Sequence, residues 1–276
     1  MAVTHTLSAA PDFHIAGSFS RAFRVIGRNV PTIAGLYLVF GALPVVVFWM
    51  IAGFSPSHIE RLPPPARLPQ LALEFALSTA FAAAVAKVVI ADRLHGRRIT
   101  PWRALLLPPR RYVSLYVAAF LIAMAPNLVY LFSNIGMLPE VFYVLSGFGM
   151  IAVEATVSGL FAPTISIVVE EDVSGPEAVR RAFALTRGYR LLLIAAFGVL
   201  AALLFLAKFA STNLITDFLL THGVGLDRAD FLRSLYWELF SAGESILFAT
   251  WVPVLYLTLR RVREGMASPH VAALFD

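Results

Sequence analysis

Polar and ionisable residues inside long apolar stretches are the ones that could form a binding site in this protein. These stretches hold Lys87, Asn127, Glu154, Lys208 and Glu244. A charged side chain within a bilayer is costly unless it is paired, hydrated or neutralised, so such residues are candidates for function. We therefore predict that these five residues line a polar cavity, with Glu154, near the middle of its stretch, as the central group.

Two ion pairs are compatible with the positions of these residues. At a helical rise of about 1.5 Å per residue, Lys87 falls at a depth similar to that of Glu154, and Lys208 lies in the same outer half as Glu244. The alternative is purely structural. In that case both lysines extend to the nearest headgroups, and Glu154 is protonated or hydrogen-bonded to a neighbour. The sequence leaves both interpretations open.

The chain lacks the residue patterns of the common catalytic and metal sites. It contains no cysteine, and its histidines are scattered without the spacing of metal ligands. It also lacks the G-x-S-x-G, P-loop, Rossmann and H-E-x-x-H patterns. We therefore predict that the protein is not an enzyme and uses no metal or other cofactor.

The stretch Glu170–Arg190 joins an acidic turn to a basic helix and then to an apolar run. Ser174 and Glu177 form an S-x-x-E pattern, which predicts a capping box at the start of the helix. Such a helix would lie in the headgroup layer with its arginines toward anionic lipid. The alternative is a solvated linker helix whose charges only set topology. The predicted headgroup contacts are Arg21, Arg24, Arg103, Arg180, Arg181 and Arg187.

The composition is that of a membrane protein. Of 276 residues, 59% are hydrophobic and only 14% are charged, compared with about 25% charged in soluble domains. The net charge of +5 could indicate nucleic acid. The arginines flank apolar spans, however, so membrane topology explains them better and no nucleic-acid partner is expected. The first ten residues lack a signal-peptide pattern, which favours the first span as an uncleaved anchor.

The apolar runs predict an all-α fold, a single domain over residues 1–276 with six transmembrane helices. A hydrocarbon core of about 30 Å needs about 20 apolar residues. Pro44 predicts a kink in the first span, and the alanines of the second predict a central helix. A loop is expected at Ser211–Ser234. The spans are predicted at residues 30–54, 70–91, 112–134, 140–169, 191–213 and 235–259.

Most arginines fall on one side of these spans. Only Arg61, Arg67, Arg228 and Arg233 fall on the other side. By the positive-inside rule, we therefore predict a bacterial inner-membrane protein with both termini in the cytoplasm. Short basic helices are expected before the first, third and fifth spans. They carry the tripeptides Arg21-Ala22-Phe23, Arg103-Ala104-Leu105 and Arg181-Ala182-Phe183, which predict three parallel hairpin repeats. The first of these helices should end near Asn29.

One juncture in the sequence is similar to a known family. The residues are Ala162-Pro163, Val168-Val169-Glu170 and the run from Ala178 to Gly188. They resemble the glycerophosphoryl diester phosphodiesterase membrane-domain family and related uncharacterised bacterial six-span proteins. The resemblance implies a six-span membrane domain over most of the chain. No soluble stretch here is long enough for the phosphodiesterase barrel of some members, so the resemblance implies no catalytic residue.

Two functions are compatible with these observations. The favoured one is a non-enzymatic inner-membrane protein that binds or moves a lipid or other amphiphile, with membrane lipids as its partners. The second is a structural or assembly scaffold without a ligand cavity, whose partner is another protein or a second copy of the chain. A lipid-open cavity containing Glu154 would favour the first, and a tightly packed six-helix core would favour the second.

Overall fold

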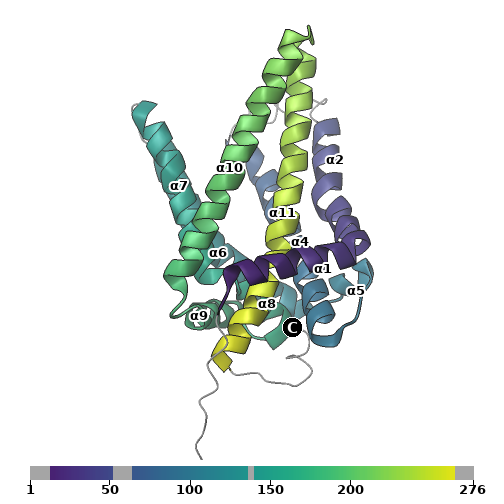
Figure 1. Cartoon of the computed structure of the whole chain (residues 1–276), viewed down its shortest axis with the longest axis vertical. Helices are drawn as coiled ribbons and strands as arrows, with labels where there is room; N and C mark the ends of the chain where they lie inside the picture. Colours follow the sequence, from purple (N-terminus) through teal and green to yellow (C-terminus); the bar gives the residue numbers. More distant parts are fainter. Residues whose placement is uncertain (1–12, 52–63, 136–139, 265–276) are drawn as a thin grey trace, which may run out of the picture.

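The computed structural model describes residues 13–51, 64–135 and 140–264, and this part of the chain is built from helices alone (Figure 1). The elements are α1 (Ile15–Tyr37), the π-helix η1 (Leu38–Ala42), α2 (Leu43–Ile51), α4 (Pro64–His95), α5 (Pro101–Leu105), α6 (Pro109–Ile135), α7 (Glu140–Phe161), α8 (Thr164–Glu171), α9 (Gly175–Leu185), α10 (Arg190–Thr221) and α11 (Leu226–Glu264).

Five helical segments in the described residues are long and apolar enough to cross a membrane. They cover Ile15–Val47, Ala72–His95, Ile151–Glu171, Arg190–Thr221 and Arg228–Glu264. The all-helical fold is therefore confirmed, with five candidate membrane-spanning helices, whereas six spans and the three hairpin repeats are not confirmed. The predicted third span, 112–134, lies within α6, but from Ala125 onward the side chains of α6 are outside the described residues.

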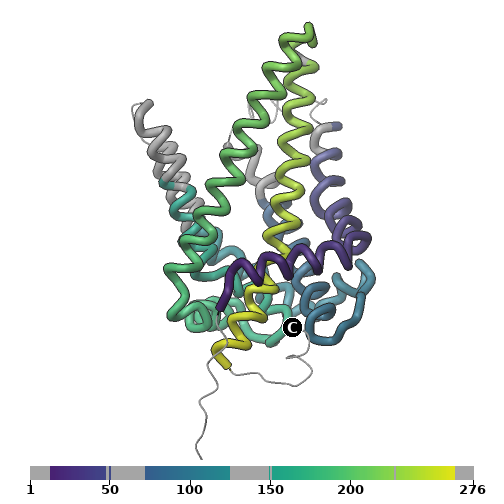
Figure 2. Tube along the Cα trace, in the orientation of Figure 1, coloured from purple at the N-terminus to yellow at the C-terminus, as the bar shows by residue number. Residues whose placement is uncertain are grey.

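The helices differ from the prediction at two places. The predicted span 140–169 contains two helices, because α7 ends at Phe161 and Pro163 occupies the N-cap position of α8. The predicted loop Ser211–Ser234 is mostly helical: α10 runs on to Thr221 and α11 begins at Leu226. No glycine or proline lies between Ser211 and Gly223, whose φ of +74° suits the turn. Figure 2 traces α10 and α11 side by side.

The first helix bends where the sequence predicts the end of the N-terminal helix. Asn29 leaves helical geometry with φ −120° and ψ 19°, and Pro31 follows it. The segment before Asn29 lies across α11 in Figure 1. It is held there by Trp251, whose Nε1 donates to Ser18 Oγ at 2.9 Å and whose ring meets Phe19 edge-on. The segment after the bend turns upward toward α2.

The kink predicted at Pro44 is present as a π-helical turn. Pro44 has no N–H and therefore cannot bond the carbonyl of Phe40, four residues earlier. Directly before it, Leu38–Ala42 forms the wider π-helix η1, a form that commonly accommodates such a defect within a helix. Around this turn, five residues line a cavity: Tyr37, Phe40, Gly41, Pro44 and Val45.

Several helices pack together at the end that carries the basic helices. There α4 contacts α1, α5, α6, α8 and α11, and its buried alanines, including Ala83, Ala84 and Ala86, allow this close approach. The short helices α5 and α9 lie at this same end in Figure 1. We call it the basic end. The hairpin between α10 and α11 marks the opposite end, here called the outer end.

Candidate functional site

The structure does not bring Lys87 and Glu154 together. Lys87 Nζ donates to the backbone carbonyl of Leu106 at 2.7 Å. Glu154 is exposed on α7 and lines a small pocket of about 200 Å³ between α6 and α7. It makes no hydrogen bond or ion pair with another described residue. The side chain of Asn127 lies outside the described residues.

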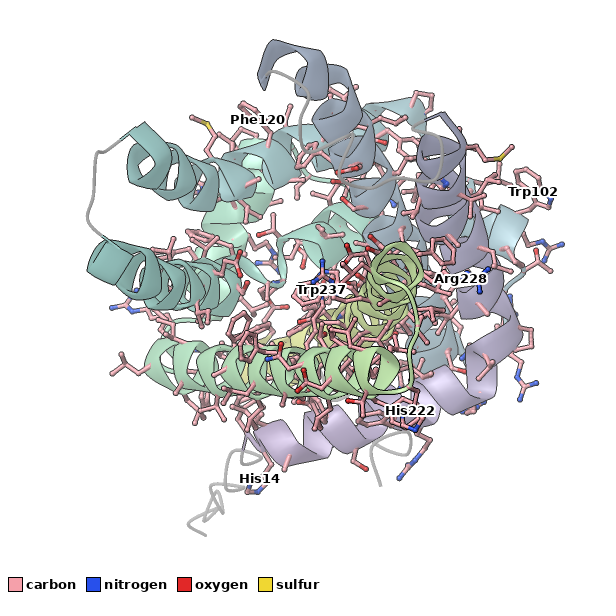
Figure 3. All side chains as sticks on the ribbon, turned by 90° about the horizontal axis from the view of Figure 1, so that it is seen from above. His14, Trp102, Phe120, His222, Arg228 and Trp237 are labelled. Carbon is pink, nitrogen blue, oxygen red and sulfur yellow. The ribbon has the colours of Figure 1, made fainter. Side chains whose placement is uncertain are left out.

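Lys208 is buried between α10 and α11 without an ion pair to Glu244 among the described residues. Its Nζ donates to Ser241 Oγ at 2.6 Å and stands 3.6 Å from the centre of the Trp237 ring. The residue is 8% exposed. The Ser241 hydroxyl and the Trp237 ring thus replace part of the hydration that the Lys208 ammonium would have in water. Figure 3, looking down the bundle, shows Trp237 near the middle and His14 and Trp102 at the periphery.

A cavity of about 600 Å³, here called the large cavity, lies among the long helices. Most of its wall is apolar, with Phe40, Phe81, Phe161, Phe197 and Phe248 as the large side chains. Residues from α1, η1, α2, α4, α6, α7, α8, α10 and α11 contribute to it. It adjoins the Glu154 pocket, because the two share part of their lining. The shared residues are Ile122, Ser158 and Ile165.

The polar groups of this cavity are carboxylates and hydroxyls. Glu74 of α4 and Glu238 of α11 are the two carboxylates, and Glu238 interacts electrostatically with both Glu74 and Lys208. Among the described residues, the cavity lining includes no lysine, arginine or histidine. The hydroxyl-bearing residues of the wall are Tyr37, Ser78, Ser158, Ser166, Ser241 and Ser245.

Ser166 gives independent evidence that the cavity receives a polar group. It is 0% exposed, it lines the cavity, and its Oγ has no hydrogen-bond partner in the described part of the chain. Buried hydroxyls are nearly always bonded, and leaving one unpaired costs about 1–3 kcal/mol. A guest molecule or ordered water in the cavity would satisfy this hydroxyl.

Sequence reasoning missed Glu74 and Glu238. Both lie within predicted spans, 70–91 and 235–259, so the rule that selected Glu154 applies equally to them. What the sequence could not show is which face of each helix they occupy. Of the predicted group, Lys208 lies beside the large cavity through Ser241 and Glu154 lies in the adjoining pocket.

A second group of charged residues gathers at the basic end around the acidic turn. Asp172, with φ +53°, accepts from Arg110 Nη2 at 2.5 Å and from Arg111 Nε at 3.0 Å. These two guanidinium groups, Arg110 first, hold the pKa of the Asp172 carboxyl below its usual value. Arg111 also donates to the carbonyl of Val169 at 2.6 Å. The start of α6 is thereby joined to the end of α8.

Glu170 and Glu171 make the corresponding contacts with α9 and α11. Glu170 pairs with Arg260, and Glu171 accepts from the Tyr256 hydroxyl at 2.9 Å and pairs with Arg181. The hydrogen bond to Glu171 is the main reason that the pKa of Arg181 is raised. Arg181 and Arg260 both reach Glu264 as well. We call this set, with Asp172, Arg110 and Arg111, the charge network.

The predicted headgroup contacts divide into two groups. Arg24, Arg103, Arg180 and Arg187 are exposed, so their guanidinium groups are available to solvent or lipid. Arg21 and Arg181 are only half-buried, but Arg181 is held inside the charge network.

Helix α9, which carries Arg181, also differs in its cap. Ser174 is at the predicted N-cap position, yet its side chain makes no capping hydrogen bond, so the predicted capping box was wrong. The start of this helix is instead positioned by packing against α6. A Cβ on Gly175 would stand only 2.6 Å from the carbonyl oxygen of Ser114.

Comparison with protein-family models, with curated proteins and with solved structures finds no match for this chain. The resemblance of its juncture residues to a membrane-domain family therefore stays an expectation from the sequence, and the functional argument depends on the cavity and the charge network.

Proposed function

We propose that the protein is a non-enzymatic inner-membrane protein that binds or moves a lipid or other amphiphile, and that the large cavity is its binding site. The observation that carries this proposal is the combination of an apolar wall with an unpaired, fully buried hydroxyl, that of Ser166. Binding sites for small molecules are typically concave, mainly apolar, and supplied with a few polar groups.

The test is whether an amphiphile accompanies the purified protein and occupies this cavity. Native mass spectrometry of protein extracted in mild detergent should show a bound molecule. Ala82→Phe should displace it, because Ala82 lines the cavity. Ala207→Phe, on the exposed face of α10, is the matched control and should retain it. Equal retention in both variants would contradict the proposed site.

A scaffold without a ligand is the second candidate. Its support is the charge network, which ties α6, α8, α9 and α11 into one compact unit and leaves Arg24, Arg103, Arg180 and Arg187 on the surface. A scaffold predicts that no amphiphile is found in any preparation and that a protein partner, or a second copy of the chain, is recovered by crosslinking instead.

We further propose that the basic end faces the cytoplasm and that its exposed arginines meet anionic headgroups. The arginine distribution supports this orientation through the positive-inside rule. A reporter active only in the periplasm, fused after Asp276, should give no signal. Activity of that fusion would reverse the orientation and remove the headgroup assignment.

A further inference from the structure

The segment that links α4 to α6 presents two large apolar side chains on the surface of the basic end. Trp102 of α5 is 78% exposed, and Leu106, which follows α5, is 71% exposed. Ala104, on the opposite face of this short helix, is 0% exposed. Figure 3 shows Trp102 at the periphery of the bundle. We call the stretch 96–107 the ledge.

The backbone of the ledge is held in place by side chains from three helices. Three of its carbonyls, including that of Leu106, accept hydrogen bonds from Thr32 of α1, Lys87 of α4 and Tyr112 of α6. The bonds from Thr32 and Lys87 are 3.2 and 2.7 Å long. Backbone carbonyls near hydrocarbon need partners within the protein, because water is scarce there. The non-helical part of the ledge is therefore suited to the edge of a bilayer.

The ledge begins where a candidate membrane span ends. That span, Ala72–His95, has 24 residues, and at about 1.5 Å per residue it is about 36 Å long. A hydrocarbon core is about 30 Å thick. If this helix crosses the membrane, the residues that follow His95 fall at the level of the lipid headgroups.

The charges of the ledge are all positive. Arg97, Arg98 and Arg103 are exposed, and residues 96–107 include no aspartate or glutamate. Tryptophan is enriched at membrane interfaces, and clustered arginines there attract anionic lipid. An anionic leaflet complements both properties of this surface, because it offers acyl chains to the apolar side chains and phosphates to the guanidinium groups.

We propose that the ledge is an interfacial contact surface for anionic lipid. The side chains of Trp102 and Leu106 lie at the boundary between headgroups and acyl chains. The three arginines bind the headgroup phosphates. This inference rests on the proposed headgroup contact of the basic end and assigns that contact to one preformed surface, which includes two arginines, Arg97 and Arg98, that the sequence did not single out.

The experiment measures contact between the ledge and lipid by fluorescence quenching in proteoliposomes. The chain has no cysteine, so Leu106→Cys provides one attachment point for a bimane probe, and Trp102→Cys provides an independent one. The liposomes contain equal amounts of phosphatidylglycerol and phosphatidylcholine, with brominated acyl chains on only one of the two lipids. Both lipids should quench the probe. Phosphatidylglycerol should be preferred about fivefold, the effect expected of one arginine at an anionic surface.

A matched site and matched variants serve as controls. Leu226, at the outer end, has the same exposed fraction of 71%. Helix α10, which leads to it, has 32 residues and is roughly 48 Å long, so a probe at Leu226→Cys should lie in water and remain unquenched. Replacing all three arginines of the ledge by glutamine should reduce the lipid preference at position 106 to about one. Arg228→Gln, at an exposed arginine of the outer end, should leave it unchanged.

The outcomes separate this inference from the proposed cavity. Probes at both ledge positions that neither lipid quenches would overturn the inference, and a disulfide between two copies of the Leu106→Cys chain would then identify a second copy as the occupant. Equal quenching by both lipids would overturn the selection of anionic lipid. Brominated lipid is present in both leaflets, so the result does not depend on which way the chain is inserted. The amphiphile retained in the cavity is measured separately, and none of these outcomes changes it.

Discussion

The charge network and the wall of the cavity both contain polar side chains, but these side chains are used differently in the two regions. In the charge network, the carboxylates of Glu170, Glu171 and Asp172 each meet an arginine or a tyrosine of another helix. In the cavity wall, the buried Ser166 hydroxyl has no hydrogen-bond partner among the described residues. The charged groups that hold the helices together thus find their partners within the chain. The Ser166 hydroxyl is instead a group that a molecule in the cavity could satisfy.

The largest effect should come from removing one arginine of the charge network. Arg260→Ala leaves Glu170, only 20% exposed at its side chain, without its guanidinium partner. Breaking a buried pair on one side costs about 3–5 kcal/mol, so at this partial exposure we expect the free energy of unfolding to fall by about 2–4 kcal/mol. Denaturant titration in detergent would measure it. Arg187→Ala, at an exposed arginine, should change it by less than about 0.5 kcal/mol.

Replacing a glycine by alanine should change the stability in opposite directions in the two regions. Gly175→Ala places a Cβ 2.6 Å from Ser114 O at the α9–α6 contact, which should destabilise the protein by about 1–3 kcal/mol. Gly243 of α11, between residues that line the cavity, has nothing within 4 Å of such a Cβ. There alanine should stabilise by about 0.4–1 kcal/mol. Melting temperatures in detergent report the sign, and a loss at both sites would contradict the contrast.

Two buried hydroxyls offer a finer comparison. Thr186 Oγ1, at the basic end, donates to backbone carbonyls such as that of Ala182 at 3.0 Å. Thr186→Val keeps the shape and should cost about 1 kcal/mol. Ser166→Ala removes an unpaired hydroxyl and should leave the ligand-free protein unchanged or more stable. Chemical denaturation after removal of bound amphiphile measures both, and similar losses would mean that Ser166 already has a partner.

The smallest effect concerns pH. Because Arg110 and Arg111 lower the pKa of Asp172 in the folded protein, the ionised carboxylate stabilises the fold above its usual value of 3.8. That contribution disappears as pH falls through the lowered pKa. The stability difference between the wild type and Asp172→Asn should therefore be constant from pH 7 to pH 5 and shrink as the pH falls below 3.8. A difference that does not shrink in acid would show that the contact does not depend on charge.

Local steric signals made part of this fold predictable from sequence. Asn29 before Pro31 indicated the bend of α1, and Pro44 indicated a kink. Each depends on residues adjacent in the chain. Pro163 is a similar signal, but apolar residues on both sides concealed the break between α7 and α8.

The candidate site was less predictable because it depends on contacts between distant helices. The depth of Lys87 suggested Glu154 as a partner, whereas the structure supplies a carbonyl, that of Leu106, from the segment after α5. Glu74 and Glu238 satisfy the same rule as Glu154, yet only the packing of α4 against α11 brings them to one cavity. Composition identifies which residues are costly in a membrane, and tertiary packing decides which of them share a space.

The position of α1 across α11 has a consequence for biosynthesis. Ser18 and Trp251, which join these helices, are 233 residues apart. At a synthesis rate of about 5–20 residues per second, α1 precedes its partner by on the order of 10–50 s. During that interval the face carrying Ala22 and Val25, buried in the finished protein, must rest on lipid or on the insertion machinery. The N-terminal helix can therefore pack against α11 only after this last helix has been synthesised and inserted.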